Sequence, residues 1–175
     1  EGLFRIGADG NAEKAMAESY TVSDDGLTYN FKLKQDRYWT DVNGYSKKVT
    51  ATDFVFGFRR LFLPETRAPK ASEYFCIKNS DKINSGEITD LSQLGVTAQG
   101  DYSLTIELQY TEPSFAMLLA MPAAMPCNEE YFIKAQGKYG LDAERTPSNG
   151  PFYVKTWNYD AWSNNNNNLV LRYSD

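Results

Sequence analysis

The stretch V-T-A-T-D-F-V-F-G-F-R-R-L, Val49–Leu61, decides the fold because it predicts a well-capped amphipathic helix. Thr50 and Asp53 have the spacing of a capping box. Large apolar side chains then recur at helical spacing on one face: Phe54, Phe58, Leu61 and Phe62. Pro64 ends the pattern, since proline cannot continue a helix interior. We expect this face to cover the apolar side of a sheet rather than to hold a ligand.

Two β-hairpins are predicted, one on each side of this helix along the chain. The dipeptide Asp25-Gly26 favours a hairpin turn because both positions tolerate positive φ, and the next strand, Thr28–Lys34, alternates apolar and polar side chains. A second turn at Gly100-Asp101 precedes another alternating strand, whose inward residues are Leu104, Ile106 and Leu108. We expect one antiparallel sheet with a single solvated face.

The rest of the chain predicts further short elements. Helices are expected over Ala71–Lys82, from Glu112-Pro113 to the residue before Pro122, and over Glu129–Gln136 with Asn128 as N-cap. Extended segments are expected over Phe152–Trp157 and Leu169–Tyr173, with a polar loop at Asn164–Asn168. Together the elements predict an α+β fold, in which a small antiparallel sheet is packed by about four helices.

Composition narrows the classes of partner. The chain has 175 residues, a formal net charge of −5 and 42% hydrophobic residues, so it can form a core and carries no basic excess for nucleic acid. The longest strongly apolar stretch, Phe115–Met125, is shorter than the about 20 residues that a membrane-spanning helix needs. We therefore expect no nucleic-acid partner and no membrane span within this sequence.

The absence of histidine removes several catalytic and metal-binding systems. Without histidine, neither a Ser-His-Asp triad nor an H-E-x-x-H zinc site can be assembled. Cys76 and Cys127 lack the close spacing of a zinc site; they form either one disulfide or two separate buried thiols. We expect no cofactor and no metal in this segment.

An enzymatic interpretation would rest on paired carboxylates. The adjacent acids are Asp24-Asp25, at a predicted turn, and Glu129-Glu130, in the first turn of a predicted helix. Both are places where acidic residues are expected for structural reasons. A carboxylate-pair hydrolase needs two such groups facing one cleft, about 5–10 Å apart. We therefore predict that the chain is not an enzyme.

A series of short phrases in fixed order closely resembles family 5 of the extracellular solute-binding proteins, the receptors of oligopeptide and dipeptide ABC importers. The resemblance runs from Glu1 to Tyr173, and its specificity lies in the order of the phrases. They are A-E-S-Y-T-V-S-D-D-G-L-T-Y-N-F-K-L-K at 17–34, Y-W-T-D at 38–41, the helix at 49–61, L-G-V-T-A at 94–98 and S-N-G-P-F at 148–152. Asp41–Lys48 departs from the family's usual W-S-D-G-T-P-V turn in length and in lacking its proline.

The resemblance implies a domain organisation. Members of the family are class II periplasmic-binding-protein-like receptors, with two large lobes and a smaller domain inserted into the first. On this pattern residues 1–10 are a short part of the first lobe, residues 11–148 form the inserted α+β domain, and residues 149–175 are strands that return to the first lobe. The sequence would then cover a minority of a full receptor, mainly its scaffold.

The resemblance also implies a function. Such a receptor captures oligopeptides outside the cytoplasm, as a cell-surface lipoprotein or in the periplasm, and delivers them to an ABC permease with its ATPase subunits. It would be a monomer, with any lipid anchor outside this segment. Alternatives are a family member carrying a nickel chelate, haem or a sugar, or an extracellular structural or adhesive module.

The nearest approach of the inserted domain to ligand, in peptide-binding members, is the segment after the long helix. Here it reads R-A-P-K-A-S, Arg67–Ser72, so the resemblance implies Pro69, Lys70 and Ser72 as ligand-proximal residues. Many relatives have tyrosine at the position of Lys70. A lysine facing the cleft would favour an acidic group of the ligand. The alternative is a solvated loop lysine without a role in binding.

Overall fold

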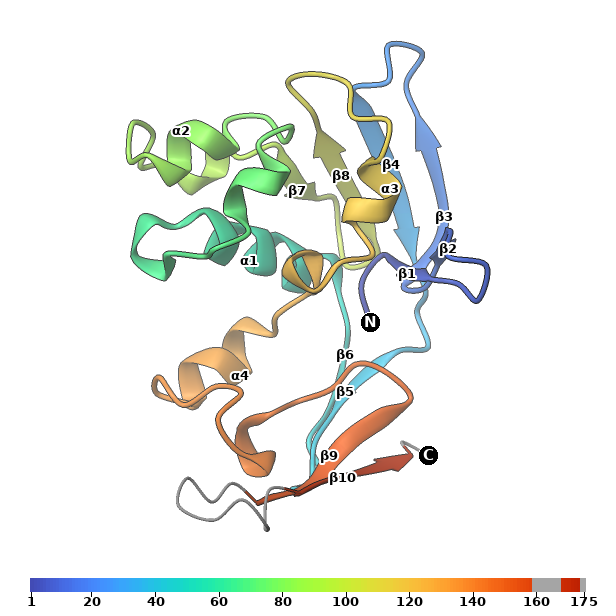
Figure 1. The fold of residues 1–175 in the computed structure, drawn as a ribbon, viewed down its shortest axis with the longest axis vertical. Helices are drawn as coiled ribbons and strands as arrows, with labels where there is room; N and C mark the ends of the chain where they lie inside the picture. Colours follow the sequence, from blue (N-terminus) through green and yellow to red (C-terminus); the bar gives the residue numbers. More distant parts are fainter. Residues whose placement is uncertain (159–167, 174–175) are drawn as a thin grey trace. The chain divides into compact units, whose positions relative to one another are not determined.

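A computed structural model of the chain describes residues 1–158 and 168–173. These residues divide into two units: unit 1 comprises Glu1–Lys34 and Thr50–Cys127, and unit 2 comprises Gln35–Val49 and Asn128–Asp175 as far as it is described. The ribbon in Figure 1 is coloured along the sequence and labels the elements of both units.

The centre of unit 1 is a four-stranded antiparallel sheet in the order β3-β4-β8-β7. Its strands are β3 (Ala17–Val22), β4 (Thr28–Leu33), β8 (Ser103–Glu107) and β7 (Val96–Ala98). Both predicted hairpins are therefore confirmed. The first turn differs in detail, because only Gly26 takes a positive φ, of 71°. Asp25 instead accepts hydrogen bonds from the Ser23 hydroxyl at 2.5 Å and the Leu27 amide at 3.0 Å.

The sheet has one apolar and one solvated face, as the alternation predicts. Partners across the strands, such as Phe31 with Leu104 and Tyr29 with Ile106, share the apolar face. Phe31, Leu104 and Ile106 are at most 2% exposed, so the central part of this face is covered, whereas Tyr20 and Val22 on the edge strand β3 are 40% and 41% exposed. On the opposite face the Thr105 hydroxyl donates to Asn30 Oδ1 at 2.8 Å. A sheet of this kind needs only one covering layer.

Helix α1 (Ala51–Phe62) supplies part of that layer and packs against β7 (Figure 1). Over β4, the rings of Phe115 and Phe4 lie against those of Tyr29 and Phe31. The predicted capping box is present, and the Thr50 amide donates to Asp53 Oδ2 at 2.9 Å. The predicted apolar stripe is buried: Phe54, Phe58, Leu61 and Phe62. At Gly57 the helix passes so close to the backbone that an added Cβ would lie 2.8 Å from the Met125 carbonyl oxygen.

The single helix predicted over Ala71–Lys82 is wrong. The chain forms a 3₁₀ turn, η2 (Ala71–Tyr74), and a short helix, α2 (Ser80–Asn84), with an interruption of turns at residues 75–79 between them. In the interruption Ile77 bridges Leu108 as an antiparallel pair, and Asn79 takes a positive φ of 62°. Tertiary pairing with the strand thus overrides local helix propensity.

Short elements complete unit 1. The predicted helix after Pro113 is present as α3 (Phe115–Leu118), followed by the 3₁₀ turn η4 (Pro122–Ala124). The further 3₁₀ turns are η1 (Pro64–Thr66) and η3 (Leu91–Gln93). A ribbon of β1 (Phe4–Ile6) and β2 (Ala12–Lys14) was not predicted. Cys76 and Cys127 are both buried thiols, and burial raises the pKa of Cys76 to about 11.

Unit 2 contains two ribbons and a helix. The unpredicted ribbon pairs β5 (Tyr38–Thr40) with β6 (Ser46–Lys48), and the predicted one pairs β9 (Phe152–Asn158) with β10 (Asn168–Tyr173). Helix α4 (Glu129–Lys134) has Asn128 as its N-cap, as predicted, and the 3₁₀ turn η5 (Ala143–Arg145) follows. The polar loop predicted at Asn164–Asn168 lies outside the described residues, except for Asn168 at the start of β10.

The carboxylate of Asp41 organises the loop between β5 and β6. It is buried and accepts from the amides of Asn43 at 2.9 Å and Tyr45 at 2.8 Å. The Tyr131 hydroxyl of α4 donates to it at 2.7 Å. Burial and this carboxylate both raise the pKa of Tyr131. Beside it, Thr40 and Ser148 exchange backbone hydrogen bonds of 2.7 and 2.8 Å, so the ribbon is fixed to the later segment of unit 2.

Replacing Phe58 by alanine tests the assignment of the core. Because this ring is 1% exposed, its loss should lower the free energy of unfolding by about 3–5 kcal/mol. Urea unfolding of the 175-residue chain measures this change. Tyr110→Ala is a matched control, since that ring is 51% exposed and its loss should change stability by less than about 0.5 kcal/mol. Equal effects of the two substitutions would contradict the assignment.

Tyr131→Phe tests the role of Asp41. The change removes one donor from a buried carboxylate and should cost about 1–2 kcal/mol, since two backbone donors remain. Hydrogen exchange at the Thr40 and Ser148 amides measures the local effect. The control is Tyr38→Phe, because Tyr38 is 44% exposed and should tolerate the loss of its hydroxyl. Unchanged exchange in Tyr131→Phe would show that the hydroxyl does not hold the loop.

Candidate functional site

The segment predicted to approach ligand lies between α1 and η2 on the surface of unit 1. After η1, Arg67 takes a positive φ of 48°, and the chain turns at residues 69–70 before η2 begins. Pro69, Lys70 and Ser72 are all exposed. The structure therefore brings the predicted residues together on one short surface turn, where their side chains are accessible.

Both ends of this turn are tied to the core of unit 1. Tyr74 is fully buried, and its hydroxyl donates to the Leu118 carbonyl at 2.9 Å. Burial raises the pKa of this phenol to about 12. At the other end, the Asn84 side chain donates to the Phe62 carbonyl at 3.2 Å. The backbone on both sides of the turn is therefore held in place by the core of unit 1.

Lys70 is paired with a carboxylate of its own segment. Its ammonium lies 2.5 Å from Glu73 Oε1, and the two side chains are 64% and 42% exposed. Exposed ion pairs of this kind contribute at most about 1 kcal/mol to the free energy of unfolding. Lys70 can therefore exchange Glu73 for another anion at small cost, but it is not an isolated positive charge.

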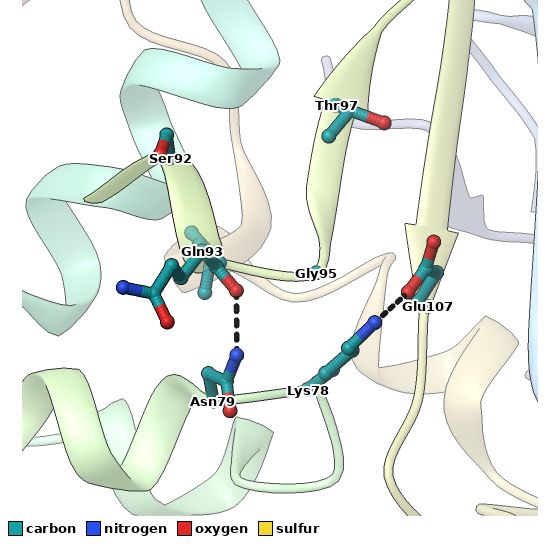
Figure 2. A pocket seen from close by; sticks show the side chains of 8 residues that line it. Lys78, Asn79, Ser92, Gln93, Gly95, Thr97 and Glu107 are labelled. Atoms are coloured by element: carbon teal, nitrogen blue, oxygen red, sulfur yellow. Dashed lines mark hydrogen bonds and ion pairs between the residues drawn. The ribbon is translucent and has the colours of Figure 1, made fainter. Parts of the chain in front are cut away.

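A second surface feature of unit 1 is a polar pocket of about 310 Å³ (Figure 2). Its lining comes from the interruption before α2, from η3 and from β7 and β8: Lys78, Asn79, Ser92, Gln93, Leu94, Gly95, Thr97 and Glu107. Pro69, Lys70 and Ser72 are not among these residues. The pocket could not be predicted from the sequence, because the pairing of Ile77 with Leu108 that assembles it has no local signal.

Three segments meet at the base of this pocket through backbone hydrogen bonds. The Gly95 amide donates to the Lys78 carbonyl at 2.9 Å, the Lys78 amide to the Glu107 carbonyl at 2.9 Å, and the Glu107 amide to the Gly95 carbonyl at 2.7 Å. An added Cβ on Gly95 would lie 2.6 Å from the Glu107 carbonyl oxygen. Only glycine allows this junction to close.

One residue of each adjacent acidic pair, Asp25 and Glu130, is engaged in hydrogen bonds or ion pairs that serve the fold. Asp25 accepts the turn hydrogen bonds described above, and Glu130 lies between Lys134 and Lys47. These two lysines lower the pKa of Glu130 to about 2. Whatever this cluster contributes to stability is present above the ordinary pKa of 4.5 and is lost as the pH falls towards 2.

Within residues 1–158 and 168–173, no three histidine, cysteine, aspartate or glutamate side chains gather as a metal site would require. In the same described ranges, every helix is too short or too polar to cross a membrane.

Comparison with known sequences identifies the family. The model for bacterial extracellular solute-binding proteins, family 5, middle region, matches residues 11–168. A dipeptide-binding protein of Lactococcus lactis subsp. cremoris is 36% identical over 171 residues, which cover 98% of this chain and 30% of that protein.

Solved structures agree with this match. The substrate-binding domain of an oligopeptide ABC transporter from Bacillus anthracis has a TM-score of 0.84 and 42% identity, over 91% of this chain and 30% of that chain. Listeria monocytogenes OppA bound to peptide has a TM-score of 0.83 and 34% identity, over 90% of this chain and 30% of that chain. The predicted receptor fold is confirmed, and the chain spans about 30% of the length of these relatives. The chain belongs to the bacterial extracellular solute-binding proteins of family 5.

Proposed function

We propose that this chain is the scaffold portion of a receptor that captures oligopeptides and delivers them to an ABC permease with its ATPase subunits. The observation that carries the proposal is the likeness of nearly the whole chain to OppA bound to peptide, with a TM-score of 0.83. The chain matches only 30% of that structure, so most ligand contacts are assigned to the remainder of the receptor.

The proposed domain organisation assigns residues 1–10 and 149–175 to the first lobe and residues 11–148 to the inserted domain. The compact units divide the chain at other points, because β9 and β10 share their unit with Gln35–Val49 and residues 128–148. Large apolar side chains of the β9–β10 ribbon are strongly exposed: Phe152, Trp157, Leu169, Leu171 and Tyr173. A two-stranded ribbon of this kind is marginal alone, which fits packing against more of the first lobe.

The receptor is proposed to work outside the cytoplasm, as a periplasmic protein or a cell-surface lipoprotein anchored outside this segment. The matched family consists of extracellular solute-binding proteins. Binding without catalysis fits the structural partners of Asp25 and Glu130. We propose a monomer, because delivery to a permease requires one closed receptor per ligand.

Pro69, Lys70 and Ser72 are proposed as the residues of this chain that come closest to the ligand. Their exposure on a turn with a fixed base supports this role. The pairing of Lys70 with Glu73 modifies the expected preference, because an acidic ligand group must compete with Glu73 for the ammonium. The preference for acidic peptides should therefore be small.

Mass spectrometry of the natively purified full-length receptor tests the substrate class. After denaturation, the released small molecules should form a ladder of short peptides. A single non-peptide solute, such as a sugar, haem or a nickel chelate, would contradict the peptide proposal while leaving the family assignment intact.

The ligand-proximal assignment predicts a charge effect in the full-length receptor. Lys70→Ala should weaken binding of a peptide with an acidic side chain up to about fivefold relative to its neutral analogue, the range of an exposed ion pair. Glu73→Gln should have the opposite effect, since it frees the ammonium. Calorimetric titration with the two peptides measures both ratios. Ratios that stay at the wild-type value in both variants would show that Lys70 lies away from the ligand.

A further inference from the structure

The polar pocket beside β7 contains one positive and one negative side chain. Lys78 Nζ lies 2.5 Å from Glu107 Oε2, and the two side chains are 52% and 44% exposed. Figure 2 shows them pointing toward one another along one side of the pocket. A half-exposed ion pair of this kind contributes little to stability. A ligand that offers a counter-charge to each of the two side chains can therefore separate them at small energetic cost.

The backbone around the pair is held in place. Lys78 and Glu107 are joined through the three-segment junction at Gly95, which fixes the origins of both side chains. Across the pocket, the Asn79 side chain donates to the Gln93 carbonyl at 2.7 Å and fixes the opposite wall (Figure 2). A pocket with a fixed frame loses less conformational entropy on binding than a mobile one.

The remaining lining selects for a small polar ligand. Asn79, Ser92, Gln93 and Thr97 are polar, and the one large apolar residue, Leu94, is 2% exposed and offers almost no surface. The volume of about 310 Å³ is at the lower end of the range of roughly 300–1,000 Å³ for ligand pockets. A ligand of few non-hydrogen atoms fits a site of this size.

We propose that this pocket binds a small zwitterion of the amino-acid type, with its carboxylate on Lys78 and its ammonium on Glu107. A lone anion or a lone cation would engage one of these side chains and leave the other without its counter-charge. A ligand that carries both charges replaces the internal pair completely. This site is independent of the proposed peptide-binding function, because its lining includes none of Pro69, Lys70 or Ser72.

Titration of the ¹⁵N-labelled 175-residue chain with glycine, followed by amide chemical shifts, tests the proposal. The Lys78, Asn79 and Gly95 amides should shift and saturate, with half-saturation on the order of tens of millimolar, because two half-exposed ion pairs supply little binding energy. Lys78→Gln and Glu107→Gln should each weaken binding by up to about fivefold, whereas Lys82→Gln should not. Lys82 is the matched control, since its pair with Glu87 is also exposed and lies outside the pocket.

Acetate and methylammonium, added singly to the wild-type chain at equal ionic strength, decide between a zwitterion site and simple ion binding. Weaker shifts with each than with glycine support the proposal, whatever the folding of the variants. Equal shifts with acetate or methylammonium alone would overturn it, as would the absence of saturation with glycine. Unchanged glycine binding in folded Lys78→Gln and Glu107→Gln chains would also overturn it.

Discussion

The burial of the apolar face of the four-stranded sheet is the constraint on which unit 1 depends. The rings of Phe54 and Phe58 on α1 and the side chains of Phe31, Leu104 and Ile106 on the sheet are all removed from water. Such burial is the dominant favourable term in folding. Because the other face of the sheet is polar, no second covering layer is needed. The arrangement gives a stable body that presents turns and pockets at its edges.

Unit 2 is organised by hydrogen bonds and ring contacts around Asp41. The buried Asp41 carboxylate accepts hydrogen bonds from two backbone amides and from the Tyr131 hydroxyl, and the Tyr131 ring packs against that of Tyr45. Exposed apolar residues are left on the β9–β10 ribbon. This exposure is consistent with the proposed assignment of the ribbon to the first lobe of a larger receptor.

The sequence predicted those elements whose stabilising interactions lie within a few residues of one another. The Thr50–Asp53 capping box, the stripe from Phe54 to Phe62 and the turn at Gly100 all indicate their structures within a few residues. The break between η2 and α2 could not be predicted, because it depends on a bridge from Ile77 to Leu108. The same bridge builds the polar pocket, so the pocket was missed for the same reason. The position of Lys70 was inferred from family resemblance, whereas its pairing with Glu73 required the structure.

We propose that this chain supports a peptide receptor without forming its main binding surface. Calorimetric titration of one oligopeptide mixture into the full-length receptor and into the 175-residue chain compares the two affinities. We expect tight binding by the full-length receptor and weak or undetectable binding by the chain alone. Equal affinity of the two would show that the principal peptide site lies within these residues.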